Sequence, residues 1–201
     1  MKIDIGLTSG PDFGLYPRSR LSCLYCSQRL TDEWGPDLAL VDIVDSEADT
    51  LEARGKAFYN LTTRRSEALA AAPIRTAIWA VMGAPGEFVT EVGREPGVSR
   101  FDIGPTLIAS AKVEVLTHDG FDYVEFPLDP KRVPTLFPKK YGGMSGCGLW
   151  RLGEANDEER TVSWTDKAFL EGVGFYHRWA APEMIRCHGK QSIYRHLLDA
   201  L

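Results

Sequence analysis

The sequence predicts an all-β protein built mainly from antiparallel strands. Short apolar segments recur along the chain, and Gly, Pro, Asn or Asp residues separate most of them. The pair Asp119-Gly120 lies between two alternating apolar segments, which is a strong hairpin signal. Residues 64–72 and 192–201 are the two segments whose composition predicts helix. The chain is therefore expected to form a sheet or barrel to which helices are minor additions.

The first 48 residues predict part of a β domain. Residues 1–19 are rich in Gly, Pro and Ser, which indicates irregular structure. Strands are expected over 21–30 and 38–44, with a turn at Trp34-Gly35-Pro36 between them. The acidic and polar stretch 45–54 then predicts a connection. We place a domain boundary within it, which divides the chain into residues 1–48 and 49–201.

Residues 49–201 predict a six-stranded antiparallel barrel. A short strand over 56–61 and the helix over 64–72 come first, and the barrel strands are expected over 74–83, 106–117, 121–128, 148–152, 169–176 and 184–187. A loop interrupted by prolines runs from residue 127 to Gly142, and the helix over 192–201 closes the barrel. Closure removes the unpaired edges of a small sheet.

Composition and charge exclude several classes of partner. The chain has 201 residues, of which 44% are hydrophobic, so it can bury a core. The 23 basic and 28 acidic residues give a net charge of −5 without a Lys/Arg block, which argues against nucleic acid. No apolar run approaches the roughly 18 residues of a membrane span, and the first residues lack the apolar core of a signal peptide. We expect a cytoplasmic protein with no membrane partner.

The four cysteines do not predict a metal site or a disulfide framework. Cys23 and Cys26 form a lone Cys-x-x-Cys, and zinc would need two further ligands. Cys187 and His188 are the nearest candidates, but adjacent residues of a strand point to opposite faces. We therefore expect free thiols, no metal and no cofactor.

The stretch from Tyr141 to Trp150 places Ser145 among four glycines, just before a strand-like run. Acyl transfer from a serine needs small neighbours, so that a carbonyl can approach, and two N–H groups that face the developing oxyanion. Gly143 can adopt a backbone conformation closed to other residues, which would turn its N–H inward beside that of Ser145. The motif therefore predicts a nucleophile, Ser145, with an oxyanion hole formed by Gly143 and Ser145. A glycine-rich turn with a solvated serine is the alternative reading.

An acidic residue, Asp37, stands at the head of the short apolar strand Leu38 to Ile43. Together with Gly-Met-Ser-Gly at Ser145, this stretch resembles the trypsin-like serine peptidases of the chymotrypsin fold. The segment Ile78 to Gly86 looks like the strand of that family that ends in a Gly-x-Pro-Gly turn. The resemblance implies a serine endopeptidase that hydrolyses peptide bonds through an acyl-enzyme, with Asp37 orienting the base. Its substrate would be a peptide or protein.

The stretch Gly172 to Tyr176 resembles the strand of the same family that lies beside the bound substrate. The resemblance assigns substrate binding to Gly174, Phe175 and Tyr176. His177 follows directly and is expected to border the specificity pocket or to lie on the surface.

The general base is missing from its expected place in the sequence. The family order is His, Asp, Ser, yet no histidine precedes Asp37, and the four present are His118, His177, His188 and His196. Residues 1–44 are also too few for a complete first barrel. We therefore expect a truncated or inactive form, in which apolar faces of residues 21–44 stay uncovered and favour pairing with another copy.

Two other functions remain open from the sequence. A non-catalytic peptidase-like module could bind extended peptides along residues 174–176 by strand pairing. An α/β-hydrolase esterase would also carry a serine flanked by glycines, followed in the chain by an acid and a histidine. Its elbow is Gly-x-Ser-x-Gly leading into a helix, however, whereas residue 147 is Cys and the run from Gly148 reads as a strand.

Overall fold

The computed structural model describes residues 5–7, 14–16, 21–28, 33–43, 45, 49, 52–53, 59–70, 77–95, 98–128, 138, 141–156 and 161–200. These residues form mainly antiparallel strands, which confirms the all-β prediction. Among them no helix has the length and apolar character that crossing a membrane requires. The predicted domain boundary at residue 48 lies outside the described residues.

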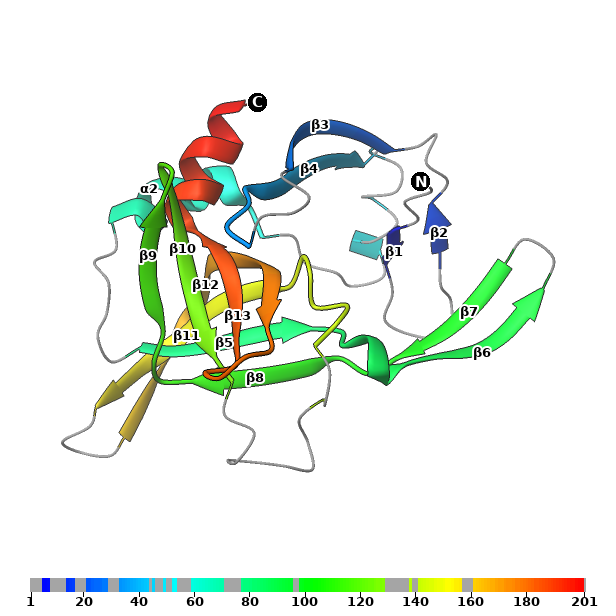
Figure 1. Ribbon diagram of the computed structural model, residues 1–201. Coiled ribbons are helices and arrows are strands. Elements are labelled where there is room, and N and C mark those ends of the chain that lie inside the picture. The colour runs from blue at the N-terminus through cyan, green and yellow to red at the C-terminus, as the bar shows by residue number, and fades with distance from the viewer. Residues whose placement is uncertain are drawn as a thin grey trace.

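One curled sheet of seven antiparallel strands forms the body of the protein (Figure 1). Its spatial order is β8-β5-β11-β12-β13-β10-β9. The strands are β5 (Ala77–Gly83), β8 (Thr106–Ser110), β9 (Glu114–His118), β10 (Phe121–Pro127), β11 (Gly148–Asn156), β12 (Thr161–Arg178) and β13 (Met184–Gly189). Asp119 and Gly120 have φ values of 48° and 82° in the turn that joins β9 to β10, so the Asp-Gly hairpin prediction is confirmed.

The prediction of a closed six-stranded barrel is wrong in strand number and in closure. The strand expected over 106–117 divides into β8 and β9, which form the two opposite edges of the sheet. At the break, Ser110 Oγ donates to the Lys112 carbonyl at 3.0 Å and lies 3.1 Å from the Lys112 N–H. A side chain that binds nearby backbone groups in this way competes with the strand ladder. The break therefore has a local cause in the serine.

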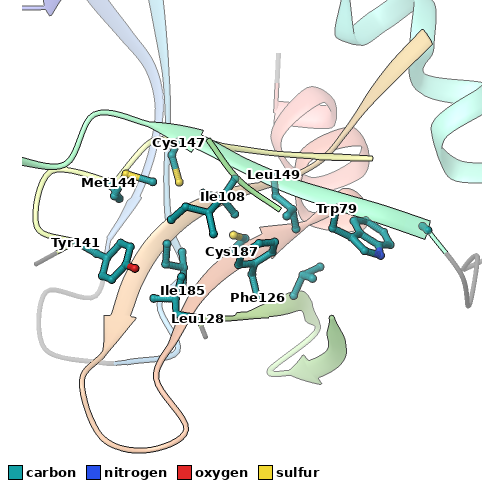
Figure 2. Packing of buried hydrophobic residues seen from close by; sticks show 13 residues of the cluster. Trp79, Ile108, Phe126, Leu128, Tyr141, Met144, Cys147, Leu149, Ile185 and Cys187 are labelled. Atoms are coloured by element: carbon teal, nitrogen blue, oxygen red, sulfur yellow. The ribbon is translucent and has the colours of Figure 1, made fainter. Parts of the chain in front are cut away.

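The interior of the curled sheet holds one large apolar cluster (Figure 2). It includes Trp79 and Val81 from β5, Phe126 from β10, Leu149 from β11, and Ile185 and Cys187 from β13. Figure 2 shows Tyr141, Met144 and Cys147 at one end of the same cluster. Residues on both faces of β13 are buried, so its outer face is covered as well.

The segment before β4 (Asp37–Ile43) covers that outer face. Cζ of Arg186 lies 3.8 Å from the ring centroid of Trp34, and Arg186 Nη1 donates to the Glu33 carbonyl at 2.8 Å. The Arg186 side chain, which is 2% exposed, also binds Glu125 of β10. A buried charge needs such partners, since desolvation penalises it. The cluster fixes the start of β4 on the sheet.

The N-terminal strands agree in part with prediction. β3 (Leu21–Gln28) pairs with β4 as an antiparallel hairpin, close to the two strands expected there. The expectation of irregular structure over residues 1–19 is wrong for β1 (Ile5–Leu7) and β2 (Gly14–Tyr16), which pair with each other. The apolar side chains of residues 21–32 and 41–44, on which the expected self-association depends, lie outside the described residues, as do the side chains of Cys23 and Cys26.

An α-helix, the C-terminal helix and a further hairpin are the other main elements of the described residues. The helix α2 (Leu61–Ala70) begins where Asn60 Oδ1 accepts the Thr63 N–H at 2.8 Å, which is an N-cap. The C-terminal helix, η3 (Ser192–Leu197) with η4 (Leu198–Ala200), was predicted. A hairpin of β6 (Val89–Glu95) and β7 (Val98–Ile103) was not; it follows the short helix η2 (Gly86–Phe88) and extends away from the sheet (Figure 1).

Candidate functional site

The candidate nucleophile Ser145 is exposed on a loop of two tight turns that leads into β11. The Met144 N–H donates to the Tyr141 carbonyl at 3.1 Å, and the Cys147 N–H donates to the Met144 carbonyl at 2.9 Å. Gly143 and Gly146 have φ values of 92° and 84°. These values lie in the region that only glycine adopts at low cost, so the glycines around Ser145 set the path of the loop.

The loop rests on the end of β5 and on the Gly-x-Pro-Gly turn that follows it. A Cβ at Gly83 would lie 2.8 Å from Met144 Sδ, and a Cβ at Gly143 would lie 2.9 Å from the Ala84 carbonyl oxygen. The Gly86 N–H donates to the Gly142 carbonyl at 2.6 Å. Contacts this close leave no room for side chains at either glycine. The two glycine-rich motifs of the sequence therefore form one packed unit.

Three backbone N–H groups of residues 142–147 have no acceptor among the described residues. Those of Met144, Gly146 and Cys147 donate to backbone carbonyls, whereas those of Gly142, Gly143 and Ser145 find none. Gly143 and Ser145 line a common pocket. Free N–H groups beside a hydroxyl are the arrangement that stabilises an oxyanion.

The pocket next to Ser145 has a volume of about 130 Å³ and a mostly apolar lining. Its lining residues are Tyr141, Gly142, Gly143, Met144, Ser145, Phe175, Tyr176, His177 and Ile185. The loop supplies one wall, and the end of β12 with Ile185 of β13 supplies the other. The structure thus brings together five residues to which the sequence assigned a role in the site: Gly143, Ser145, Phe175, Tyr176 and His177.

Gly174 joins the loop to β12. Its N–H donates to the Cys147 carbonyl at 2.8 Å, and its own carbonyl accepts the Gly146 N–H at 2.7 Å. A Cβ at Gly174 would lie 2.5 Å from Cys147 Sγ, so only glycine fits there. β11 ends its pairing with β12 at Val173, and among the described residues β12 pairs beyond Gly174 only with β13. Within the described part of the chain, one edge of β12 is therefore open beside the pocket.

His177 is held by a carboxylate from the turn between β12 and β13. Its Nε2 lies 2.9 Å from Glu183 Oε1, and its ring packs against Tyr141 and Trp179 at centroid distances of 5.0 and 4.1 Å. Its Nδ1 is buried and has no partner among the described residues.

Burial, with Glu183 and Glu87 nearby, raises the pKa of Tyr141 to about 12, so this hydroxyl stays protonated at neutral pH.

Asp37 does not line the pocket. Its side chain is exposed, its carboxylate has no hydrogen-bond partner in the described part of the chain, and its N–H donates to His188 Nε2 at 3.0 Å. The His188 ring stacks on Phe175, which does line the pocket, at a centroid distance of 4.4 Å. Burial lowers the pKa of His188 to about 4, and the charge of Asp122 opposes this effect only in part. His188 is therefore neutral at neutral pH and links Asp37 to the pocket wall.

The two cysteines nearest the site, Cys147 and Cys187, are not suited to act as nucleophiles or metal ligands. Burial raises the pKa of Cys147 to about 11 and that of Cys187 well above its usual value. A thiol that stays protonated is a poor nucleophile and a poor metal ligand. The described residues also contain no group of three His, Cys, Asp or Glu side chains that could hold a metal ion. Ser145, by contrast, has an exposed side chain.

Comparison with protein-family models, with curated proteins and with solved structures found no match to this chain. The resemblance to trypsin-like peptidases thus depends on the motifs and on the geometry above.

Several residues of the site were not identified from the sequence. Tyr141, Met144 and Ile185 line the pocket, and Glu183 pairs with His177. Tyr141 and Met144 flank Ser145 in the same motif, which is a signal that they would lie close to it. Glu183 and Ile185 had no such signal, because they reach the site through the pairing of β13 with β12.

Proposed function

We propose that this chain is a serine endopeptidase domain of the trypsin-like type, which cleaves peptide bonds through an acyl-enzyme on Ser145. One observation carries the proposal: an exposed serine hydroxyl stands in a glycine-built loop in which the N–H groups of Gly143 and of Ser145 itself have no acceptor among the described residues. In a turn that is merely exposed to solvent, the N–H groups could point into water in any direction. Nothing would then require two of them to be free beside a serine hydroxyl.

Substrate would bind as an extended segment. The open edge of β12 beyond Gly174 offers backbone groups for strand pairing, and the apolar pocket accepts one substrate side chain. This pose brings the scissile carbonyl to Ser145 Oγ. As Oγ bonds to the carbonyl carbon, the C=O electron pair moves to the oxygen, and the Gly143 and Ser145 N–H groups stabilise that charge. The serine proton passes through a base to the leaving amine, and water then hydrolyses the ester.

The base is the incomplete part of the site. None of the four histidines, all of which belong to the described residues, forms a hydrogen bond with Ser145. We therefore expect slow acylation by residues 1–201. Oxyanion stabilisation and binding alone accelerate such reactions by roughly a thousand- to ten-thousand-fold over water. In the trypsin-like arrangement a histidine supplies the base, and Asp37 would orient it.

The test is labelling of Ser145 by a fluorophosphonate probe, followed by mass spectrometry of the labelled peptide. We expect slow labelling of residues 1–201, none after Ser145→Ala, and no change after Ser66→Ala, which alters an exposed serine of α2. Labelling of the Ser145→Ala variant at the rate of the unaltered chain would refute the assignment of Ser145 as the nucleophile. Rapid labelling of the unaltered chain would refute the account of the base.

A second function, peptide binding without catalysis, is favoured by the open edge of β12 together with the absent base. It predicts that extended peptides bind the Ser145→Ala variant and the unaltered chain equally well, and that neither is acylated. Isothermal titration separates it from the first proposal. The geometry does not support an α/β-hydrolase, because Ser145 leads into strand β11 rather than into a helix, and the sheet is antiparallel.

A further inference from the structure

We propose that Gly86 is a positioning residue for the oxyanion site. Its N–H holds the Gly142–Gly143 peptide in the orientation that keeps the Gly143 N–H available to a substrate. This inference rests on the proposed acyl transfer at Ser145. It adds a residue from outside the loop, to which neither the motif nor the resemblance assigned this role.

The first argument is the direction of the peptide. The Gly142 carbonyl accepts the Gly86 N–H at 2.6 Å, and the peptide between Gly142 and Gly143 is not among the cis bonds. In a trans peptide the C=O and the N–H point in opposite directions. When Gly86 binds the carbonyl, it therefore turns the Gly143 N–H away from the β5 turn. That N–H is among those of the loop without an acceptor in the described part of the chain.

The second argument is that the loop alone does not determine this orientation. Gly142 and Gly143 both lack a Cβ, so the peptide between them rotates with little steric resistance. A Cβ at Gly142 would meet nothing within 4 Å, so no side-chain packing at Gly142 opposes this rotation. A reversed peptide would direct the carbonyl toward the substrate oxygen and abolish the hole. The hydrogen bond from Gly86 selects between the two orientations.

The third argument is the rigidity of the turn that carries Gly86. Pro85 is buried, and its carbonyl accepts the Phe88 N–H at 2.9 Å. The Phe88 carbonyl in turn accepts the Gly104 N–H at 2.8 Å, and this hydrogen bond closes the base of the β6–β7 hairpin. A donor fixed on a closed turn can hold a mobile peptide, whereas a donor on a free loop would move with it.

The turn accepts a proline at position 86, which makes a selective test available. Pro85 has φ −57° and ψ 135°, a conformation that permits a following proline, and Gly86 is the first residue of η2, where proline is favoured. Gly86→Pro removes the N–H and places ring carbon against the Gly142 carbonyl. Gly86→Ala retains the N–H, and its Cβ would lie 3.1 Å from the same carbonyl oxygen, so a small shift suffices.

The kinetic experiment compares fluorophosphonate labelling and peptide hydrolysis for the unaltered chain and both variants. Loss of one oxyanion donor lowers kcat by roughly 100- to 1,000-fold. We expect a loss of this order in Gly86→Pro with little change in KM, and recovery of most of the rate in Gly86→Ala. An unchanged rate in Gly86→Pro, or an equal loss in both variants, would overturn the proposal.

The second experiment does not depend on activity. Selective ¹⁵N-glycine labelling gives amide signals that Gly86→Ala and Gly143→Ala assign, and hydrogen exchange is then measured for each. We expect slow exchange at Gly86, fast exchange at Gly143, and a shifted Gly143 signal in Gly86→Pro. Exchange at Gly86 as fast as at Gly143 would overturn the positioning role, even in an inactive protein. A protected Gly86 without any labelling of Ser145 would uphold the positioning and count against the peptidase function.

Discussion

The ion pair between Arg186 and Glu125 is expected to be the polar interaction most sensitive to substitution. Arg186 Nε and Nη2 both donate to Glu125 Oε1, at 3.1 and 2.5 Å, and the two side chains are 2% and 11% exposed. Removing one partner of a buried pair leaves an uncompensated charge, which costs about 3–5 kcal/mol. Arg186 would retain the Glu33 carbonyl and the face of Trp34. We therefore expect Glu125→Gln to cost about 3 kcal/mol, the lower end of that range.

Urea unfolding monitored by tryptophan fluorescence measures this loss. The matched control is Glu67→Gln, which breaks an ion pair to Arg64 between side chains that are 47% and 29% exposed. An exposed pair of this kind contributes well under 1 kcal/mol, so the control should unfold almost as the unaltered protein does. A loss below about 1 kcal/mol in Glu125→Gln would show that the charge of Arg186 does not depend on Glu125.

Three further predictions concern the site and its surroundings. Gly143→Ala should destabilise the protein by about 1–3 kcal/mol in urea unfolding, because φ is 92° and the added Cβ meets the turn; it should also abolish labelling of Ser145. The lowered pKa of His188 means that the unfolded state binds more protons between pH 6.5 and about 4. Stability should therefore fall as the pH drops through this window, by up to about 3 kcal/mol, and His188→Gln should flatten the profile; an equal slope in both would contradict the assignment. Cys147 and Cys187 should resist iodoacetamide at pH 8 until the protein unfolds, as peptide mass spectrometry can show; rapid modification in the native state would refute their burial.

The sequence predicted the elements whose signals are local. The Asp119-Gly120 hairpin and the strands around it follow from turn chemistry and alternation, which depend on neighbouring residues. The break at Ser110 was missed because alternation continues across it, and the competing side-chain hydrogen bonds are not visible in a pattern. The β6–β7 hairpin was missed for a related reason. Its exposed strands carry charged residues such as Glu91 and Arg94, which weaken the apolar signal.

The predictions for the site divide in the same way, into local features that the sequence indicates and long-range contacts that it does not. The motif around Ser145 predicted that Gly143 would need freedom in φ, because the requirement belongs to one short segment. Partners that arrive through strand pairing, such as Glu183 beside His177, carry no sequence signal of their own. The hydrogen bond from the Asp37 N–H to His188 Nε2 joins residues 151 positions apart in the sequence. Because its donor is a backbone group, no pattern of residue types predicts it.

The construction of the Ser145 loop from glycines and backbone hydrogen bonds has a consequence for how this protein can change. The parts that would carry out the reaction depend on main-chain groups of Gly143, Gly146 and Gly174, and substitutions there are constrained by φ or by space. The parts that would choose the substrate are side chains on the opposite wall, such as Tyr176 and Ile185. In the proposed peptidase, reactivity and selectivity would therefore be encoded at separate positions. New preferences can be selected by varying that wall while the main-chain scaffold stays intact.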